Sequence, residues 1–72
     1  MAEPMEALSV RELEVLALLA HGKENKEIAA ELGLKPTTVR GHLETIYLKL
    51  LVTNRVEATV EWLRLADTTL EK

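Results

Sequence analysis

A three-residue connection near the middle of the chain constrains the fold more than any other feature of the sequence. Gly33, Leu34 and Lys35 separate two segments that favour helix formation. Gly33 is suited to ending the first segment in a left-handed conformation, and Pro36 is suited to the first position of the second. Two helices joined by so short a turn form either a helix-turn-helix unit or an ordinary helical hairpin.

Start and stop signals divide the rest of the chain in the same way. Ser9 and Glu12 form a capping box before the first helix, and Gly22 ends it. Asn25 caps the second helix, and a second capping signature at residues 54–57 precedes the fourth. The expected helices cover residues 10–21, 26–32, 36–50 and about 55–66.

No segment alternates polar and apolar residues with a period of two, so we expect an all-α fold with a three-helix core and a C-terminal helix. Residues 8–66 form the expected domain, between a flexible segment at 1–7 and a tail at 67–72. A domain this small buries only about 60% of its unfolded surface. Without cysteine, neither disulfides nor thiolate ligands can stabilise it.

The sequence also disfavours a membrane protein and an enzyme. No apolar run reaches the roughly 20 residues that cross a bilayer, and the first residues lack a signal-peptide pattern, so we expect a cytoplasmic protein. His21 and Glu24 straddle a helix end and make a poor metal site. Ser9 serves as a cap, and no glycine-rich phosphate loop is present. We therefore expect no catalysis, metal or cofactor.

The third expected helix has two different faces when its residues are placed about 100° apart. The apolar side carries Val39, Leu43, Ile46 and Leu50. The opposite side carries Thr37, Arg40, Gly41, Glu44 and Leu48, and one flank carries Thr38, His42, Thr45 and Lys49. If this helix enters a major groove, the opposite side faces base edges and the flank reaches phosphates. The alternative is a solvated surface.

The chemistry of the polar side suits DNA. Arg40 can pair with guanine, Gly41 permits a close approach, and Glu44 can accept a hydrogen bond from cytosine although it repels phosphates. A glycine in mid-helix is seldom found on a merely solvated surface. The net charge of −3 argues against a polyanion partner, yet residues 35–55 hold four basic side chains against one acidic, a net +3.

The fourth expected helix carries two apolar stripes. One contains Ala58, Trp62 and Leu65, and the other, nearly opposite, contains Val56, Val60 and Leu63. A helix added to a three-helix core needs one stripe only. The second therefore predicts a homodimer interface, with scattered exposed aliphatic residues as the alternative.

Four ordered segments together resemble the DNA-binding domain of LuxR-type regulators, also called the NarL/FixJ type. Residues 8–16 (LSVRELEVL) resemble the family opening L-[TS]-x-R-E-x-E-V-L, and residues 22–29 (GKENKEIA) resemble G-x-x-N-K-E-I-A. Residues 38–42 (TVRGH) are similar to T-V-[KR]-x-H, and residues 46–58 fit the C-terminal half. The resemblance covers about residues 8–66.

The resemblance implies a bacterial transcription regulator whose third helix reads double-stranded DNA and whose fourth helix dimerises. The implied base-facing residues are Arg40, Gly41 and Glu44, and the implied phosphate contacts are Asn25, Lys26, Thr38 and Lys49, with His42 nearby. Members usually carry a sensory domain as well, so the chain corresponds to an excised output domain or a free-standing regulator. Glu44 stands where members often have a basic or neutral polar residue.

Two other interpretations share these helices. One is the promoter-reading domain of a sigma factor, although the matches from His42 to Ala58 favour the LuxR type. The other is a helical protein-interaction module that binds another regulator, which would suit Glu44, Leu48 and the acidic total. Salt separates the second from DNA binding, because a DNA binder loses affinity steeply as salt rises.

Overall fold

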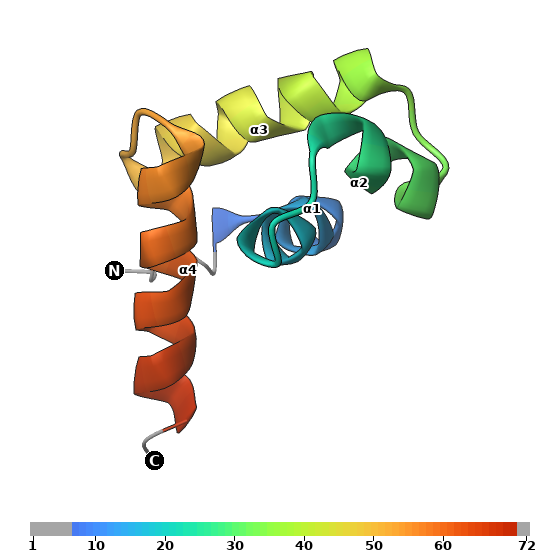
Figure 1. Ribbon diagram of the computed structural model, residues 1–72. Helices are drawn as coiled ribbons and strands as arrows, with labels where there is room; N and C mark the ends of the chain where they lie inside the picture. The colour runs from blue at the N-terminus through green and yellow to red at the C-terminus, as the bar shows by residue number, and fades with distance from the viewer. Residues whose placement is uncertain (1–6, 71–72) are drawn as a thin grey trace.

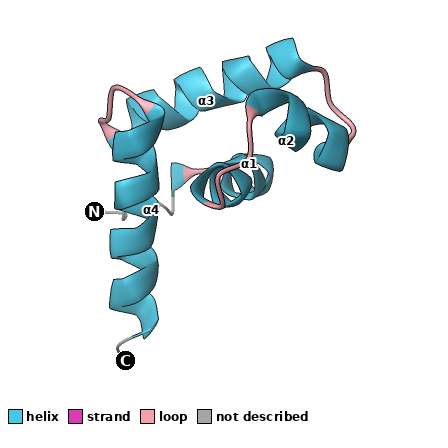
Figure 2. Ribbon diagram, viewed as in Figure 1, coloured by secondary structure: helices cyan, strands magenta, loops and turns pink. Residues whose placement is uncertain are grey.

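The computed structural model describes residues 7–70, without the side chains of Leu65 and of residues 67–70. Four α-helices and no strand make up the described range, so the predicted all-α class is confirmed (Figures 1 and 2). The helices are α1 (Val10–Ala20), α2 (Asn25–Leu32), α3 (Pro36–Leu50) and α4 (Arg55–Leu70). No helix in this range is long and apolar enough to cross a membrane. The predicted N-terminal segment, apart from Ala7, lies outside the described residues.

The ends of α1 follow the predicted signals. Ser9 Oγ accepts a hydrogen bond from the Glu12 amide at 3.1 Å, and Glu12 Oε1 accepts one from the Ser9 amide at 2.9 Å. Gly22 follows the helix with φ of 87°, and the next amide, of Lys23, donates back to the Leu18 carbonyl at 3.2 Å. Both capping predictions for α1 are confirmed.

The prediction that Asn25 caps the second helix is wrong, because α2 begins at Asn25 itself. Glu24 is the extended residue before the helix, and its amide donates to Glu27 Oε1 at 2.7 Å. A glutamate at the third helical position thus satisfies the orphan donor. The turn into α3 is as predicted: Gly33 is left-handed with φ of 69°, and Pro36 is the first residue of α3.

The fourth helix begins as predicted and ends later than expected. Asn54 Oδ1 accepts a hydrogen bond from the Glu57 amide at 2.9 Å, which caps α4. The backbone stays helical to Leu70, so most of the expected tail at 67–72 belongs to α4, and residues 71–72 lie outside the described range. No glycine or proline follows Gly41, so the sequence holds no stop signal near residue 66.

The helix α1 lies at the centre of the domain and contacts the other three helices. Figure 1 shows it end-on below α3, with α2 on one side and α4 running down the other. The buried core is formed by Leu8, Val15, Leu16, Leu19, Ile28, Ala29, Val39, Leu43, Ile46, Leu50 and Ala58. The predicted apolar stripe of α3 is therefore buried, and its opposite side faces solvent.

Candidate nucleic-acid interface

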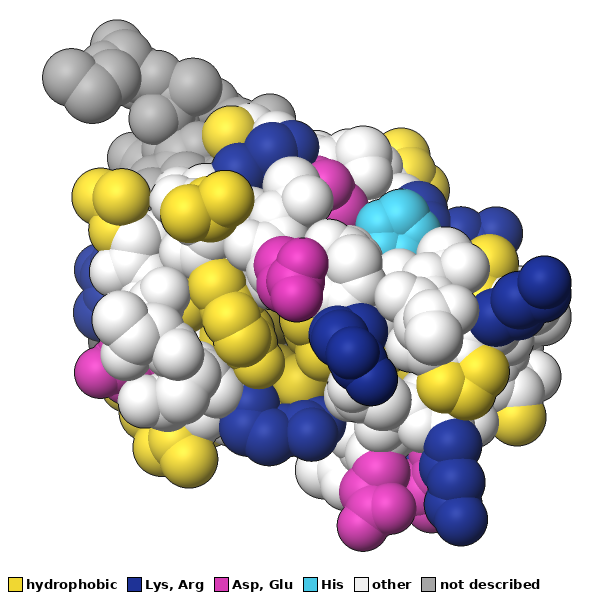
Figure 3. Space-filling model, turned by 90° about the horizontal axis from the view of Figure 1, so that it is seen from above, with side chains coloured by type: hydrophobic (Ala, Val, Ile, Leu, Met, Phe, Trp, Pro, Cys, Tyr) yellow, Lys and Arg dark blue, Asp and Glu magenta, His cyan; other side chains and the backbone are white. Residues whose placement is uncertain are grey.

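The outer side of α3 is the surface seen in Figure 3, which looks down onto this helix. Basic side chains, an imidazole and a central carboxylate are mixed on this face with uncharged surface. All four residues predicted to face bases are exposed: Thr37, Arg40, Gly41 and Glu44. The helix-turn-helix geometry therefore presents one polar side of α3 outward, with the side chains that the helical wheel predicts.

The two charged side chains among the predicted base-facing residues, Arg40 and Glu44, have no partner in the part of the chain that the structure describes. Across residues 7–70, the side chains of Thr37, Arg40 and Glu44 make no hydrogen bond and no ion pair. Arg40 and Glu44 are four residues apart and lie in the less favourable order for an ion pair along a helix. Their hydrogen-bonding groups are thus available to an external ligand.

On the flank of α3, Thr38 is exposed and His42 is half-buried. Lys49 has partners that the sequence did not indicate: its Nζ lies 2.9 Å from Glu12 Oε1 and 3.0 Å from the Ala7 carbonyl oxygen. An ammonium group has three N–H donors, so one remains for a phosphate. Lys49 consequently ties the end of α3 to the start of α1.

Glu12 is buried and takes part in both the capping box and this ion pair. The hydrogen bond from Lys49 holds the pKa of Glu12 below its ordinary value of 4.5, and the Ser9 amide acts in the same direction. Burial alone would raise that pKa, because desolvation disfavours the charged form. The carboxylate is therefore kept ionised by its two partners.

The start of α2 supplies the other predicted phosphate contacts. The first amides of a helix and its dipole attract anions, and Asn25 and Lys26 are the first two residues of α2. Lys26 is exposed and Asn25 is half-buried, with its Oδ1 buried and without a hydrogen-bond partner in the described part of the chain.

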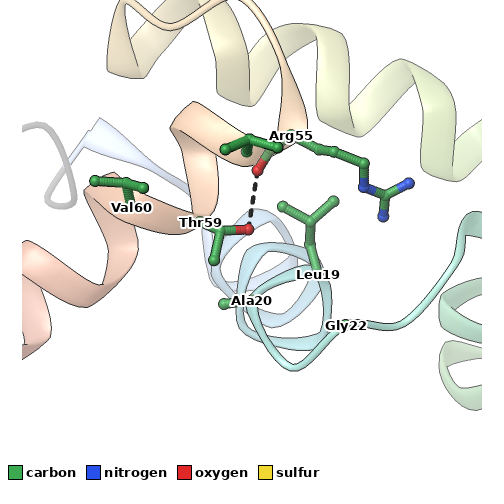
Figure 4. A pocket seen from close by; sticks show the side chains of 7 residues that line it. Leu19, Ala20, Gly22, Arg55, Thr59 and Val60 are labelled. Carbon is green, nitrogen blue, oxygen red and sulfur yellow. Dashed lines mark hydrogen bonds between the residues drawn. The ribbon is translucent and has the colours of Figure 1, made fainter.

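Arg55 is a further basic residue in this region whose role sequence reasoning missed. Its Nη2 donates to the carbonyl oxygen of Lys23 at 2.9 Å, which joins the start of α4 to the turn between α1 and α2. Figure 4 shows the side chain reaching from α4 past Leu19. Burial raises the pKa of Tyr47 on α3, and the positive charge of the Arg55 guanidinium acts in the opposite direction and lowers it. The local sequence does not predict this contact, because the two residues are 32 positions apart in the chain.

A second surface lies on α4. Val56, Val60 and Leu63 are exposed by 68%, 58% and 56%, whereas Ala58 is fully buried. Val56 and Val60 border a shallow pocket of about 280 Å³ that continues onto the end of α1 at Leu19 and Gly22 (Figure 4). The stripe predicted to face outward does so, and the apolar surface extends beyond α4.

One family model, described as "Bacterial regulatory proteins, luxR family", matches residues 6–62 of this chain. The chain belongs to the luxR family. The match confirms the resemblance on which the sequence-based prediction rests and favours it over the sigma-factor alternative. The four helices thus form a luxR-family helix-turn-helix DNA-binding domain.

Individual relatives of this luxR-family domain are bacterial regulators. The transcriptional regulatory protein LiaR of Bacillus subtilis (strain 168) is 49% identical over 59 residues, which cover 82% of this chain and 28% of LiaR. The nitrate/nitrite response regulator protein NarP of Escherichia coli (strain K12) is 42% identical over 62 residues, covering 86% and 29%. The spore germination protein GerE of Bacillus subtilis (strain 168) is 45% identical over 60 residues, covering 83% and 81%. The chain thus spans less than a third of LiaR and NarP.

Proposed function

We propose that this luxR-family domain recognises specific DNA sequences as a homodimer within a transcription regulator. The observation that carries the proposal is the outer side of α3, where Arg40 and Glu44 are exposed without partners across the described residues. Side chains of this kind, on the second helix of a helix-turn-helix, contact base edges in the major groove.

The phosphate contacts in this proposal come from the start of α2 and from the flank of α3. The start of α2 offers its first amides together with Asn25 and Lys26. The flank of α3 offers Thr38, His42 and the remaining donor of Lys49. Contacts of this kind fix the position of the helix without reading sequence, and Thr37, Arg40, Gly41 and Glu44 do the reading.

The homodimer in this proposal forms through Val56, Val60 and Leu63 of α4. These side chains are more than half exposed, and Val56 and Val60 border a pocket on the end of α1. A second copy of α4 would therefore bury apolar surface on both helices. Two copies of α3 then read half-sites about one helical turn apart, roughly 10 base pairs.

A sensory domain that switches the DNA-binding domain belongs to the same proposal. Its support is the relative NarP, a response regulator of which the matched segment makes up 29%.

A protein partner is the second candidate function, because Leu48 stands 76% exposed among the polar groups of α3.

Selection of bound duplexes from a random pool at physiological salt tests the proposal. We expect a palindrome whose half-sites are about 10 base pairs apart, and an affinity that falls steeply with salt. Sedimentation of the complex should give two protein chains per duplex. Enrichment of no sequence would refute specific recognition, one chain per duplex would refute the dimer, and binding that ignores salt would favour the protein partner.

A further inference from the structure

Gly41 has no structural reason to be glycine. It lies inside α3, where glycine is among the least favourable residues, and its φ is negative. A Cβ added at Gly41 would meet no atom of another helix or of any side chain outside its immediate neighbours within 4 Å. Neither packing nor backbone conformation therefore requires the missing side chain. The absent side chain instead leaves open space on the side of α3 that also carries Glu44.

Glu44 is a second residue on this side of α3 that no contact within the described residues explains. Its carboxylate is exposed and makes no ion pair or hydrogen bond in the range 7–70, although it faces the surface proposed to meet a polyanion. Near phosphates an unpaired carboxylate is repelled, so a favourable role needs a hydrogen-bond donor on the DNA. In the major groove guanine and thymine present no amino donor, whereas cytosine and adenine each present one. Adenine also places its N7 acceptor beside that donor, which repels a carboxylate, so Glu44 suits cytosine best.

The positions of Gly41 and Glu44 on α3 suggest that the two residues have a common role. Gly41 lies three residues before Glu44, which places both on the same side of the helix. A glutamate side chain is shorter than that of Arg40, so its carboxylate reaches a base edge only if the helix axis lies close to the groove floor. The missing side chain at Gly41 allows this approach.

We infer that Gly41 and Glu44 act as a unit that selects a cytosine in each half-site, an inference that rests on the proposed function. Gly41 seats α3 deeply, and Glu44 accepts a hydrogen bond from the cytosine amino group. Arg40 lies four residues away, about 6 Å along the helix. The two side chains can therefore contact different base pairs of one half-site, a guanine for Arg40 and a cytosine for Glu44.

Selection with the wild-type chain and with Glu44→Gln tests the choice of base. Glutamine pairs with adenine, so we expect the selected cytosine to change to adenine at one position of each half-site, with the guanine unchanged. Glu14→Gln is the matched control, because Glu14 is an exposed acid on α1 and its substitution removes the same charge. The control should keep the cytosine. A cytosine that Glu44→Gln retains would overturn the inference.

Gly41→Ala tests the seating of the helix with two measurements of opposite sign. Alanine should raise the melting temperature of the free domain, because it favours the helix. The same variant should bind the selected duplex about tenfold more weakly, as expected for a disturbed base contact. Unchanged affinity would overturn the role of Gly41. A wild-type chain that binds DNA without enriching any sequence would instead refute the proposed function, so the two failures are distinguishable.

Discussion

The two halves of α3 use their polar side chains in opposite ways. In the first half, taken as residues 36–44, Arg40 and Glu44 are exposed and make no polar contact with residues 7–70. In the second half, Lys49 binds Glu12 and the Ala7 carbonyl, and Tyr47 lies near Arg55. The apolar stripe runs through both halves, so the difference lies in the polar groups alone. The second half fixes the helix to the domain, with one donor of Lys49 left over, and the polar side chains of the first half are left free for a ligand.

The largest effect on stability is expected from Lys49→Ala. It leaves the buried Glu12 carboxylate without its ammonium partner, and we expect a loss of about 2–3 kcal/mol, between the values for exposed and fully buried pairs. Urea unfolding measures it. Lys23→Ala is the control, because that ion pair with Glu31 is longer, at 3.8 Å, and its two side chains are 43% and 50% exposed. Equal losses in the two variants would show that the pair does not anchor α3.

Arg40→Ala, in the free half of α3, should affect binding instead. We expect about 1–3 kcal/mol weaker binding to the selected duplex and a change in stability below about 0.5 kcal/mol. Fluorescence anisotropy with specific and scrambled duplexes measures the affinity. An equal loss on both duplexes would make Arg40 a phosphate contact, and a loss of stability would contradict the division between the two halves.

Acid should weaken the anchored half by protonating Glu12. The Lys49 hydrogen bond lowers the pKa of Glu12 in the folded state below its ordinary value of 4.5. The ion pair therefore stabilises the fold fully above that value and is lost as the pH falls through the folded-state pKa. Thermal unfolding between pH 6 and pH 3, values chosen to bracket about 4.5, should show a steeper decline for the wild type than for Lys49→Ala. Parallel curves would contradict the assignment.

Local signals explain which parts of the fold are predictable from the sequence. The signals that set these boundaries act over three residues: the capping box of Ser9 and Glu12, and the sequence from Gly33 to Pro36. The ends of α1 and the turn between α2 and α3 are therefore predicted correctly. The period of the apolar stripe identifies which side of α3 is exposed. Asn25 was misassigned because Glu24 and Glu27 supply an equally local cap.

The contacts that position the interface arise from tertiary structure and leave no such signal. Lys49 meets Glu12 across 37 residues, and Arg55 meets the carbonyl of Lys23 across 32 residues. The charge of both cations was visible in the sequence, and it suggested DNA for Lys49. Only the packing of α1 against α3 and α4 shows that internal groups also use these cations.

The smallest effect is expected at Leu51, which ends the anchored half. It is left-handed with φ of 61°, as Gly22 and Gly33 are after α1 and α2. A leucine in this conformation is disfavoured by about 1–2 kcal/mol, and a side chain 91% exposed has little packing to lose. Glycine has more conformational freedom than leucine in the unfolded chain, which offsets part of the stability gained by relieving this strain. We expect Leu51→Gly to stabilise the domain by about 1 kcal/mol, which raises the melting temperature by about 4–8 °C.

The same variant sharpens the comparison between the two halves when its DNA affinity is measured. If Leu51 serves only to end the helix, Leu51→Gly should leave the affinity for the selected duplex unchanged. Gly33→Ala is the reciprocal control and should destabilise the domain, because alanine is strained at φ of 69°. A lower affinity for Leu51→Gly would mean that the exposed leucine touches a ligand, in addition to the phosphate contact proposed for Lys49. An unchanged melting temperature would instead contradict the strain at Leu51.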